Sequence, residues 1–452
     1  MSSWLDLFAE RGEDPAIFEG DEVLSYGGLA AAVRAASGRL AELGVGPQSV
    51  VVLHADFSRA GIAALFALID RRAIIIPMVN LTSAAFETVR SECGAELLCR
   101  VEPELTVERL GEGPREGVPP SLYAELGQRD AAGLVLLSSG STGKPKAILH
   151  DLHRLVEARL GKSGRKRLSI VLFLLFDHIG GINTLLNSLF SGGKAIVVPE
   201  RTPEAVCRLI EKHRATILPI SPSFLNLILI GGFHRQFDLG SLRLITYGTE
   251  PMPDSLLRRV REAFPRVRLL QTFGTSETGI ATTASELSSS TFFKIKGGDV
   301  AYRIVDGELQ LKSSTQFLGY LNQQADNLTE DGWFKTGDLV EEAANGFIRI
   351  RGRSQEVINV GGEKVLPVEV ESLLLQSPKI ADCLVYGEPN AITGQIVCTN
   401  VVLREPISKL ELRRHIFELL AGQVDRFKIP SRINIVEELA HSDRFKKRRT
   451  AP

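Results

Sequence analysis

Short apolar segments alternate with helix-like stretches up to about residue 250, and this alternation constrains the fold more than any other feature. The apolar segments are rich in Val, Ile and Leu and occupy residues 49–54, 73–77, 134–137, 170–175, 195–199 and 242–247. Stretches with helical periodicity, such as 26–43 and 203–213, lie between them. Parallel strands are buried on both faces and are joined by crossover helices. The pattern therefore predicts an α/β fold in which helices cover parallel sheets.

A different pattern begins after about residue 295. Short alternating segments separated by turns, as in 302–311 and 346–351, indicate antiparallel strands. Asp306-Gly307 has the composition of a two-residue hairpin turn. These features predict a β-rich subdomain attached to the large α/β domain.

The last hundred residues combine both kinds of pattern. They are helix-like at 369–375 and 409–420 and strand-like at 383–387 and 396–403. A chain of 452 residues is also too long for one ordinary domain. We therefore expect an N-terminal domain of residues 1–353 and a small, mobile C-terminal α+β domain of residues 355–452, with a hinge near Gln355.

Composition and charge exclude several classes of protein. Hydrophobic residues make up 44% and charged residues 24%, and 53 Lys and Arg nearly balance 54 Asp and Glu, which does not favour nucleic acid as a partner. The strongest apolar run, Ser169 to Phe176, is far shorter than a membrane span of about twenty residues. Acidic residues inside the first apolar stretch disfavour a secretory signal. Five cysteines without metal-ligand spacing favour a reducing, cytoplasmic location.

A loop rich in glycine and hydroxyl groups follows the apolar run 134–137. Residues 138–146 read Ser-Ser-Gly-Ser-Thr-Gly-Lys-Pro-Lys. Glycines let the backbone approach an anion, hydroxyls donate hydrogen bonds, and the lysines supply positive charge. The loop therefore predicts phosphate binding and the use of ATP.

Two alternatives apply to this loop. The P-loop of common NTPases needs two glycines separated by four residues and a Ser or Thr after the lysine. Gly140 and Gly143 are too close for this, and Pro145 follows Lys144. A flexible surface turn would explain the loop if it stood alone.

Four further motifs follow the loop. They are Tyr247-Gly248-Thr249-Glu250-Pro251, the segment 271–279 (Gln-Thr-Phe-Gly-Thr-Ser-Glu-Thr-Gly), the segment 333–339 (Trp-Phe-Lys-Thr-Gly-Asp-Leu) and the segment 351–358 (Arg-Gly-Arg-Ser-Gln-Glu-Val-Ile). With the loop, this ordered set resembles the acyl-adenylate-forming superfamily, which contains acyl-CoA synthetases, the adenylation domains of nonribosomal peptide synthetases, and luciferases. The resemblance extends over nearly the whole chain and implies activation of a carboxylic acid by ATP.

The resemblance also assigns the residues that would bind the nucleotide. The phosphate loop would consist of Ser138, Ser139, Gly140, Ser141, Thr142, Gly143, Lys144 and Lys146. Adenine would lie between Phe273-Gly274, where the family usually has a stacking tyrosine, and the segment Gly248, Thr249, Glu250 and Pro251. Asp338 would accept hydrogen bonds from the ribose hydroxyls, with Arg353 as a second ribose contact. Ser276 and Glu277 would contact the α-phosphate and Mg²⁺, with Thr142 as a second candidate for the metal.

The catalytic lysine is assigned by spacing within the C-terminal motif. The segment 439–449 differs from the family at Ala440, Ser442 and Phe445, but the distance from Leu439 to Lys446 is kept. Lys446 is therefore predicted to bridge the substrate carboxylate and the α-phosphate. A register shifted to Lys447, or a solvated basic tail without a catalytic role, would also fit the segment.

The acyl pocket and the thiol path are predicted from two further segments. His178 aligns with a pocket histidine of the family, with Ile179, Gly180 and Asn183 as candidate pocket walls; a histidine satisfied within a buried turn is the alternative. Gly361 and Gly362 resemble the loop that lines the pantetheine tunnel of thioester-forming members, although a tight β-turn would have the same sequence.

These assignments predict a carboxylic acid ligase. It would activate a small to medium acid as acyl-AMP with release of pyrophosphate and pass the acyl group to the thiol of CoA or of an acyl or peptidyl carrier protein. Two alternatives remain open. A stand-alone amino-acid adenylation domain would use Asp177 to bind the substrate ammonium, and a non-catalytic relative would bind ATP without chemistry.

Overall fold

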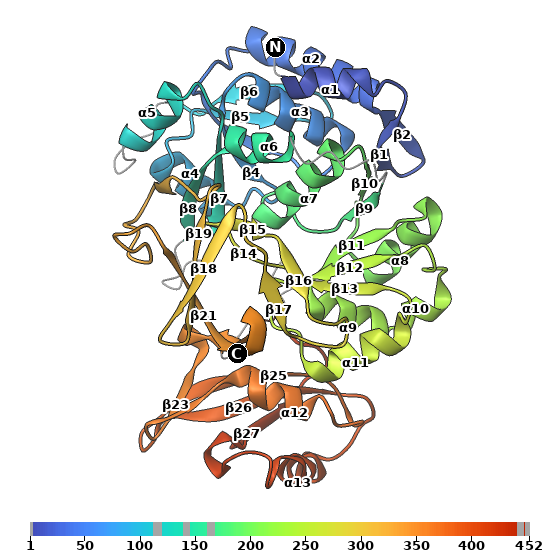
Figure 1. Cartoon of the computed structure of the whole chain (residues 1–452), viewed down its shortest axis with the longest axis vertical. Coiled ribbons are helices and arrows are strands. Elements are labelled where there is room, and N and C mark those ends of the chain that lie inside the picture. Colours follow the sequence, from blue (N-terminus) through green and yellow to red (C-terminus); the bar gives the residue numbers. More distant parts are fainter. Residues whose placement is uncertain (1–2, 112–119, 139–144, 161–167, 441–446, 448–452) are drawn as a thin grey trace.

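The computed structural model describes residues 3–111, 120–138, 145–160, 168–440 and 447. Its upper part contains two sheets that lie side by side, with helices around and between them (Figure 1). The first sheet has the order β13 (Arg268–Gln271), β12 (Leu244–Tyr247), β11 (Ile217–Ile220), β9 (Ser169–Leu172), β10 (Lys194–Val197), β1 (Pro15–Glu19) and β2 (Glu22–Ser25). Its strands are parallel except where β1 meets β2.

The second sheet is parallel in its middle and antiparallel at its edges. Its order is β20 (Gly319–Tyr320), β8 (Lys146–Asp151), β7 (Gly133–Ser138), β4 (Ile74–Met78), β3 (Val50–His54), β5 (Leu97–Arg100) and β6 (Thr106–Arg109). Strands β7, β4, β3 and β5 are parallel, whereas β20, β8 and β6 pair antiparallel with their neighbours.

Side chains of β3 point alternately into two different cores. Val51 and Leu53 join the core between the two sheets, whereas Val50 and Val52 join the core on the outer face of their sheet. Because both faces of the strand are buried, it has no polar face and reads as a continuous apolar run. The same double burial explains why these segments could be recognised from the sequence.

Helices fill the layer between the sheets and cover the outer faces. The central layer contains α1 (Ser3–Glu10), α2 (Tyr26–Glu42), α3 (Arg59–Asp70), α6 (Leu152–Leu160) and α7 (Ile179–Phe190). The outer face of the first sheet carries α8 (Pro203–His213), α9 (Pro222–Ile230), α10 (Phe233–Gln236) and α11 (Asp254–Ala263). The outer face of the second sheet carries α4 (Ser83–Glu92) and α5 (Pro120–Gln128).

Helix α8 illustrates how local sequence sets these boundaries. The side chain of Thr202 accepts a hydrogen bond from the backbone N–H of Ala205, and Pro203 occupies the first helical position. Val206 and Ile210, one turn apart, are both buried against the first sheet. Arg214 ends the helix in the left-handed conformation. The predicted helix at 203–213 is therefore confirmed.

The β-rich part forms an antiparallel sheet beside the cavity described below. Its order is β16 (Thr283–Ser285), β17 (Phe293–Ile295), β22 (Ile348–Arg353), β21 (Phe334–Glu342), β19 (Glu308–Ser313) and β18 (Val300–Val305), and a separate hairpin joins β14 (Phe273–Thr275) to β15 (Gly279–Ala281). Asp306 and Gly307 both have positive φ, as a tight hairpin turn between β18 and β19 requires.

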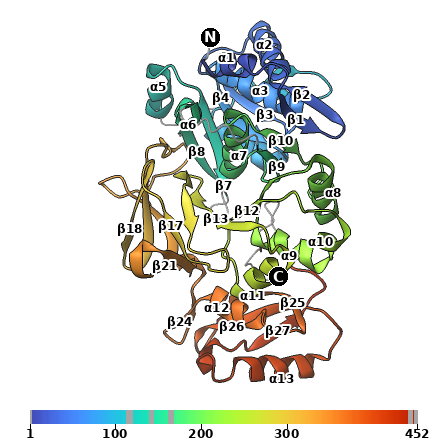
Figure 2. The same cartoon turned by 45° about the vertical axis from the view of Figure 1, so that its right-hand side comes forward.

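The C-terminal part has a sheet of its own at the bottom of both views, with α13 (Lys409–Leu420) outermost (Figures 1 and 2). The sheet order is β24 (Glu363–Val365), β23 (Ile358–Val360), β26 (Gly394–Leu403) and β25 (Ile380–Asn390), with β27 (Arg432–Ile435) also paired to β26. Helices α12 (Pro367–Leu374) and α13 share its core. The predicted combination of a large α/β part, a β-rich part and a small α+β part is confirmed.

Candidate active site

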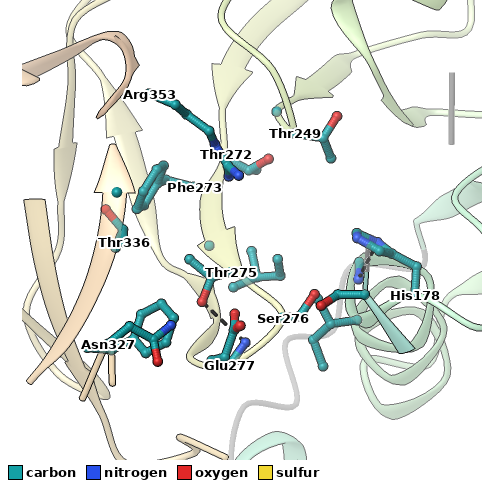
Figure 3. Close-up of a pocket in the computed structure, with 18 of the residues that line it drawn as sticks. His178, Thr249, Thr272, Phe273, Thr275, Ser276, Glu277, Asn327, Thr336 and Arg353 are labelled. Carbon is teal, nitrogen blue, oxygen red and sulfur yellow. Dashed lines mark hydrogen bonds between the residues drawn. The ribbon is translucent and has the colours of Figure 1, made fainter. Parts of the chain in front are cut away.

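A cavity of about 570 Å³ opens at the carboxyl ends of parallel strands. Ile220 ends β11, Gly248 and Thr249 follow β12, and Thr272 follows β13; all of them line the cavity. In open α/β sheets, ligands bind at this edge because loops there can vary while the strands stay fixed. Figure 3 shows Thr249 and Thr272 facing the cavity beside Arg353.

The cavity brings together residues from widely separated segments of the sequence. Among the predicted site residues, those that line it are Ser138, Lys146, His178, Ile179, Gly180, Asn183, Gly248, Thr249, Phe273, Gly274, Ser276, Glu277 and Arg353. Motifs separated by more than two hundred residues therefore share one hollow, with His178 on one side and Phe273 and Arg353 on the other (Figure 3).

Other predicted residues lie elsewhere. Glu250 and Pro251 line a second hollow of about 40 Å³ next to the C-terminal part, and Glu250 Oε1 accepts a hydrogen bond from the backbone N–H of Ser223 at 2.6 Å. Gly361 and Gly362 form an exposed turn between β23 and β24, with φ of 63° and 93°, and do not line the large cavity. Residues 139–144, and with them the middle of the phosphate loop, fall outside the described residues, as does Lys446.

Glu277 lies in the turn between β14 and β15 and is only 8% exposed. Its Oε1 accepts a hydrogen bond of 2.8 Å from the hydroxyl of Tyr320, and its backbone N–H donates to Thr275 Oγ1 at 3.2 Å. Burial and the neighbouring carboxylate raise the pKa of Tyr320 above its usual value. Tyr320 therefore stays a hydrogen-bond donor to the carboxylate throughout the physiological pH range.

The donor set around Glu277 suits a magnesium ion that is shared with a substrate. No cluster of three His, Cys, Asp or Glu side chains that could hold a metal occurs within the described ranges. Magnesium keeps several waters and is commonly bound by one or two carboxylates together with substrate phosphates. A single buried carboxylate at the cavity wall fits that mode and does not fit a metal site built from protein alone.

His150 supports the same turn from β8. Its Nε2 lies 2.7 Å from the carbonyl oxygen of Ser276, and because a carbonyl only accepts, Nε2 carries the proton. Burial lowers the pKa of His150 to about 4, so the ring is neutral at neutral pH. The sequence gives no signal for His150 or Tyr320, because neither residue belongs to one of the motifs.

His178 caps the helix that reaches the cavity. It is the residue before α7, and its Nδ1 accepts a hydrogen bond of 3.2 Å from the backbone N–H of Gly180. In a neutral ring the proton then lies on Nε2. A Cβ at Gly180 would come within 2.9 Å of Leu174 and 3.1 Å of the His178 ring, so glycine keeps this imidazole in place.

Asp338 and Arg353 meet across neighbouring strands. The two residues are paired in the β21–β22 register, and Arg353 Nε donates to Asp338 Oδ1 at 3.2 Å. Asp338 is 5% exposed, whereas the arginine side chain is about half exposed and lines the cavity. The carboxylate thus holds the guanidinium at the cavity rim.

Phe273 presents a flat apolar surface. It lies in β14, is buried, and packs against Phe293 with ring centroids 5.9 Å apart. A supported aromatic wall of this kind can stack on a purine. Thr336 and Asn327 lie on the same side (Figure 3) and line the cavity, as does Lys335. Thr336 and Lys335 belong to the motif 333–339, whereas Asn327 lies outside every motif.

Asp177 does not line the large cavity. Its Oδ2 accepts a hydrogen bond of 3.4 Å from the backbone N–H of Val79, so this carboxylate joins the α7 approach to the end of β4. That position favours a scaffolding role over contact with a substrate ammonium.

Comparison with known proteins gives the family. Residues 6–320 match the AMP-binding enzyme family, and residues 369–446 match the AMP-binding enzyme C-terminal domain. The chain belongs to the AMP-binding enzymes. This confirms the resemblance to the acyl-adenylate-forming superfamily.

Relatives of this AMP-binding enzyme cover nearly all of its length. It is 28% identical to the indoleacetate–CoA ligase of Aromatoleum aromaticum, over 97% of this chain and 94% of that protein. It is also 28% identical to the 2-succinylbenzoate–CoA ligase of Bacillus licheniformis, over 97% and 96%. The predicted acid–thiol ligase activity, with an acid activated by ATP, is confirmed by these matches.

The fold is shared with solved structures of the same kind. An anthranilate CoA ligase in complex with anthranoyl-AMP superposes with a TM-score of 0.81 at 22% identity, covering 98% of this chain and 95% of that one. Among the described residues, no helix has both the length and the apolar character needed to cross a bilayer.

Proposed function

We propose that the large cavity is the site where a carboxylic acid is adenylated and then transferred to CoA. The observation that carries the proposal is the convergence of Phe273, Ser276-Glu277, Lys146 and Arg353 with the His178 helix end in one hollow. An aromatic wall, phosphate-binding groups and a separate acyl side are the parts that the reaction needs.

The nucleotide would occupy the side of the cavity that carries Phe273 and Arg353. Phe273 offers its face to adenine, and Arg353, oriented by Asp338, contacts the ribose. Lys146 contributes positive charge toward the phosphates, and Glu277 would hold magnesium together with phosphate oxygens. Magnesium would neutralise phosphate charge when bound.

The first step joins two anions. A carboxylate oxygen of the acid attacks the α-phosphorus of ATP, and the bond between that phosphorus and pyrophosphate breaks. Ser276 and the predicted lysine, Lys446, would stabilise the charge on the α-phosphate as it changes. In the second step the thiolate sulfur of CoA attacks the acyl carbon, AMP leaves, and the thiol proton passes to solvent.

The acyl part would lie near α7. Ile179, Gly180 and Asn183 line that side of the cavity, next to His178 and Ile280. The named relatives act on indoleacetate and 2-succinylbenzoate, both acids with a ring. We infer an aromatic or similarly bulky acid as substrate.

The location is proposed from the cysteines. All five cysteines of the chain are free and buried, which supports a reducing, cytoplasmic location.

The test is acid-dependent exchange of pyrophosphate into ATP across aryl, short- and medium-chain fatty and amino acids, followed by thioester formation with CoA or a carrier protein. Exchange with aryl acids and transfer to CoA are expected. Exchange with amino acids alone would favour the amino-acid adenylation alternative. Acyl transfer to a carrier protein and not to CoA would show that the carrier protein is the acceptor. ATP binding without any exchange would favour a non-catalytic relative.

A further inference from the structure

A small hollow of about 10 Å³ adjoins the acyl side of the cavity and is lined in part by a charged side chain. Ile179, Asn183 and Ile280 line both the large cavity and this hollow. The remaining walls of the hollow are Leu155, Arg159, Ile182, Leu186, Gly279 and Thr315. Arg159 therefore lies directly behind residues that line the acyl side of the cavity.

Arg159 lies on α6 and faces α7. Its Nη2 donates a hydrogen bond of 2.5 Å to Oδ1 of Asn183, which fixes the guanidinium against the cavity wall. Its Nε is buried and has no hydrogen-bond partner within the described part of the chain. A buried donor without a partner is costly, and a charged one more so, unless a ligand completes it.

The surroundings of Arg159 are mostly apolar. Leu155 and Leu186 line the hollow and are buried. Burial lowers the pKa of Arg159, while the charge of Asp299 acts in the opposite direction. An arginine remains charged in proteins, so the hollow contains a partly desolvated cation.

We propose that the preferred acid carries a second carboxylate, at the end away from the one that is activated, and that Arg159 binds it. This inference rests on the proposed function, because it takes the acid to lie along α7. Arginine matches a carboxylate through two parallel N–H donors, and the free Nε beside a terminal nitrogen provides such a pair. Asn183 acts as a positioning residue that fixes the guanidinium.

The test compares matched acids that differ only in the distal group: phenylacetate with 4-carboxyphenylacetate, and hexanoate with adipate. Binding to the full chain is measured by calorimetry in the presence of a non-hydrolysable ATP analogue, which needs no turnover. The dicarboxylate is expected to bind at least about ten-fold more tightly than its partner in one pair. In Arg159→Met this ratio should fall to about one.

Three further variants keep the test informative. Asn183→Asp has nearly the same size and places a carboxylate on the guanidinium, so it should also remove the preference by repelling the second carboxylate. Arg154→Met changes an exposed arginine of the same helix and should leave the ratio unchanged. If Arg159→Met does not fold, Arg159→Lys takes its place and should retain part of the preference.

Each outcome separates the two proposals. Preference for the dicarboxylates that Arg159→Met and Asn183→Asp remove supports the inference, even if pyrophosphate exchange fails and the proposed function falls. Equal binding of both members of each pair by the wild type, or a preference that survives in Arg159→Met, overturns it. Exchange with monocarboxylates alone would overturn the inference and leave the proposed function intact.

Discussion

The hydroxyl of Tyr320 donates a hydrogen bond of 2.8 Å to Oε1 of Glu277, and this contact ties the short edge strand β20 to the turn between β14 and β15. Tyr320 is buried, and the Nζ of Lys146 lies 5.4 Å from the centre of its ring. One tyrosine therefore orients the carboxylate proposed to hold magnesium and also packs under a lysine proposed to face phosphate.

Tyr320→Phe should lower the rate of adenylation by about ten- to hundred-fold, because a hydrogen bond to a charged group is worth about 1.5–3 kcal/mol. Steady-state pyrophosphate exchange measures the effect, together with the magnesium concentration needed for half-maximal rate. Tyr302→Phe is the matched control, since Tyr302 donates to the Gly346 carbonyl at 3.3 Å outside the cavity. Equal exchange rates in the two variants would show that the Tyr320 hydroxyl does not contribute to adenylation.

His150 predicts a dependence of stability on pH. Its pKa is about 4 in the folded protein and about 6.5 in an unfolded chain, so the unfolded state binds more protons between these values. Above about pH 6.5, neutral His150 makes its full contribution to the free energy of unfolding. This contribution falls by about 3 kcal/mol as the pH drops toward 4. Denaturant unfolding of the wild type at both pH values measures the loss.

His150→Gln is the control for that measurement, because glutamine can donate to the Ser276 carbonyl and does not titrate. The wild type should lose about 3 kcal/mol more than this variant between pH 7 and pH 4. Identical pH profiles for the two proteins would mean that His150 is not buried in its neutral form.

Asp338→Asn should weaken ATP binding by about ten-fold, since Arg353 loses the charge that orients it. The KM for ATP is expected to rise more than kcat falls, because the proposed contact is to the ribose and not to the reacting phosphorus. Asp331→Asn interrupts a similar pair, with Arg303, on the surface away from the cavity. It should have no effect on the KM, and an equal rise in both variants would contradict the assignment.

Lys447 and Lys446 should behave differently when substituted. Lys447 Nζ lies 2.6 Å from Asp382 Oδ1 and 2.9 Å from the Cys383 carbonyl, with side chains 12% and 6% exposed for Lys447 and Asp382. Although burial opposes the charge, Asp382 and Glu371 hold the pKa of Lys447 above its usual value. This lysine is engaged in a buried ion pair in this arrangement of the chain.

Lys447→Met should therefore cost about 3–5 kcal/mol of stability by leaving Asp382 buried without its cation. Lys379→Met, which breaks the exposed pair with Glu411, should cost less than about 1 kcal/mol. Lys446→Ala should instead remove adenylation with little change in stability. If Lys447→Met left stability unchanged and abolished pyrophosphate exchange, Lys447 and not Lys446 would be the catalytic lysine.

Elements of the fold with strong periodicity could be predicted from the sequence. The buried strand β3 and the amphipathic helix α8 were recognisable because burial on two faces, or on one, leaves a distinct pattern of apolar residues. The apolar run Ser169 to Phe176 was only partly a strand. The strand β9 ends at Leu172. The buried apolar residues that follow it, such as Phe173 and Phe176, lie in the connection between β9 and α7.

The site could be predicted where its residues fall in contiguous motifs. Phe273, Ser276 and Glu277 share one hairpin and therefore one stretch of sequence. Tyr320, His150 and Arg159 reach the same region through tertiary packing alone, and a lone tyrosine, histidine or arginine in a strand or helix carries no local signal. Sequence could not place Glu250 and Pro251 on the neighbouring hollow either, because the path of the loop after β12 depends on contacts with α9.

The central claim, that the Glu277 turn is where the acid is activated, is tested most directly by pyrophosphate exchange in Glu277→Gln. Glu286→Gln is the control, because that glutamate is exposed and its carboxylate accepts a hydrogen bond from the Ser290 hydroxyl, away from the cavity. With an acid that the wild type accepts, exchange should fall about 100-fold or more in Glu277→Gln and remain unchanged in Glu286→Gln. Unimpaired exchange in a folded Glu277→Gln protein would contradict the account.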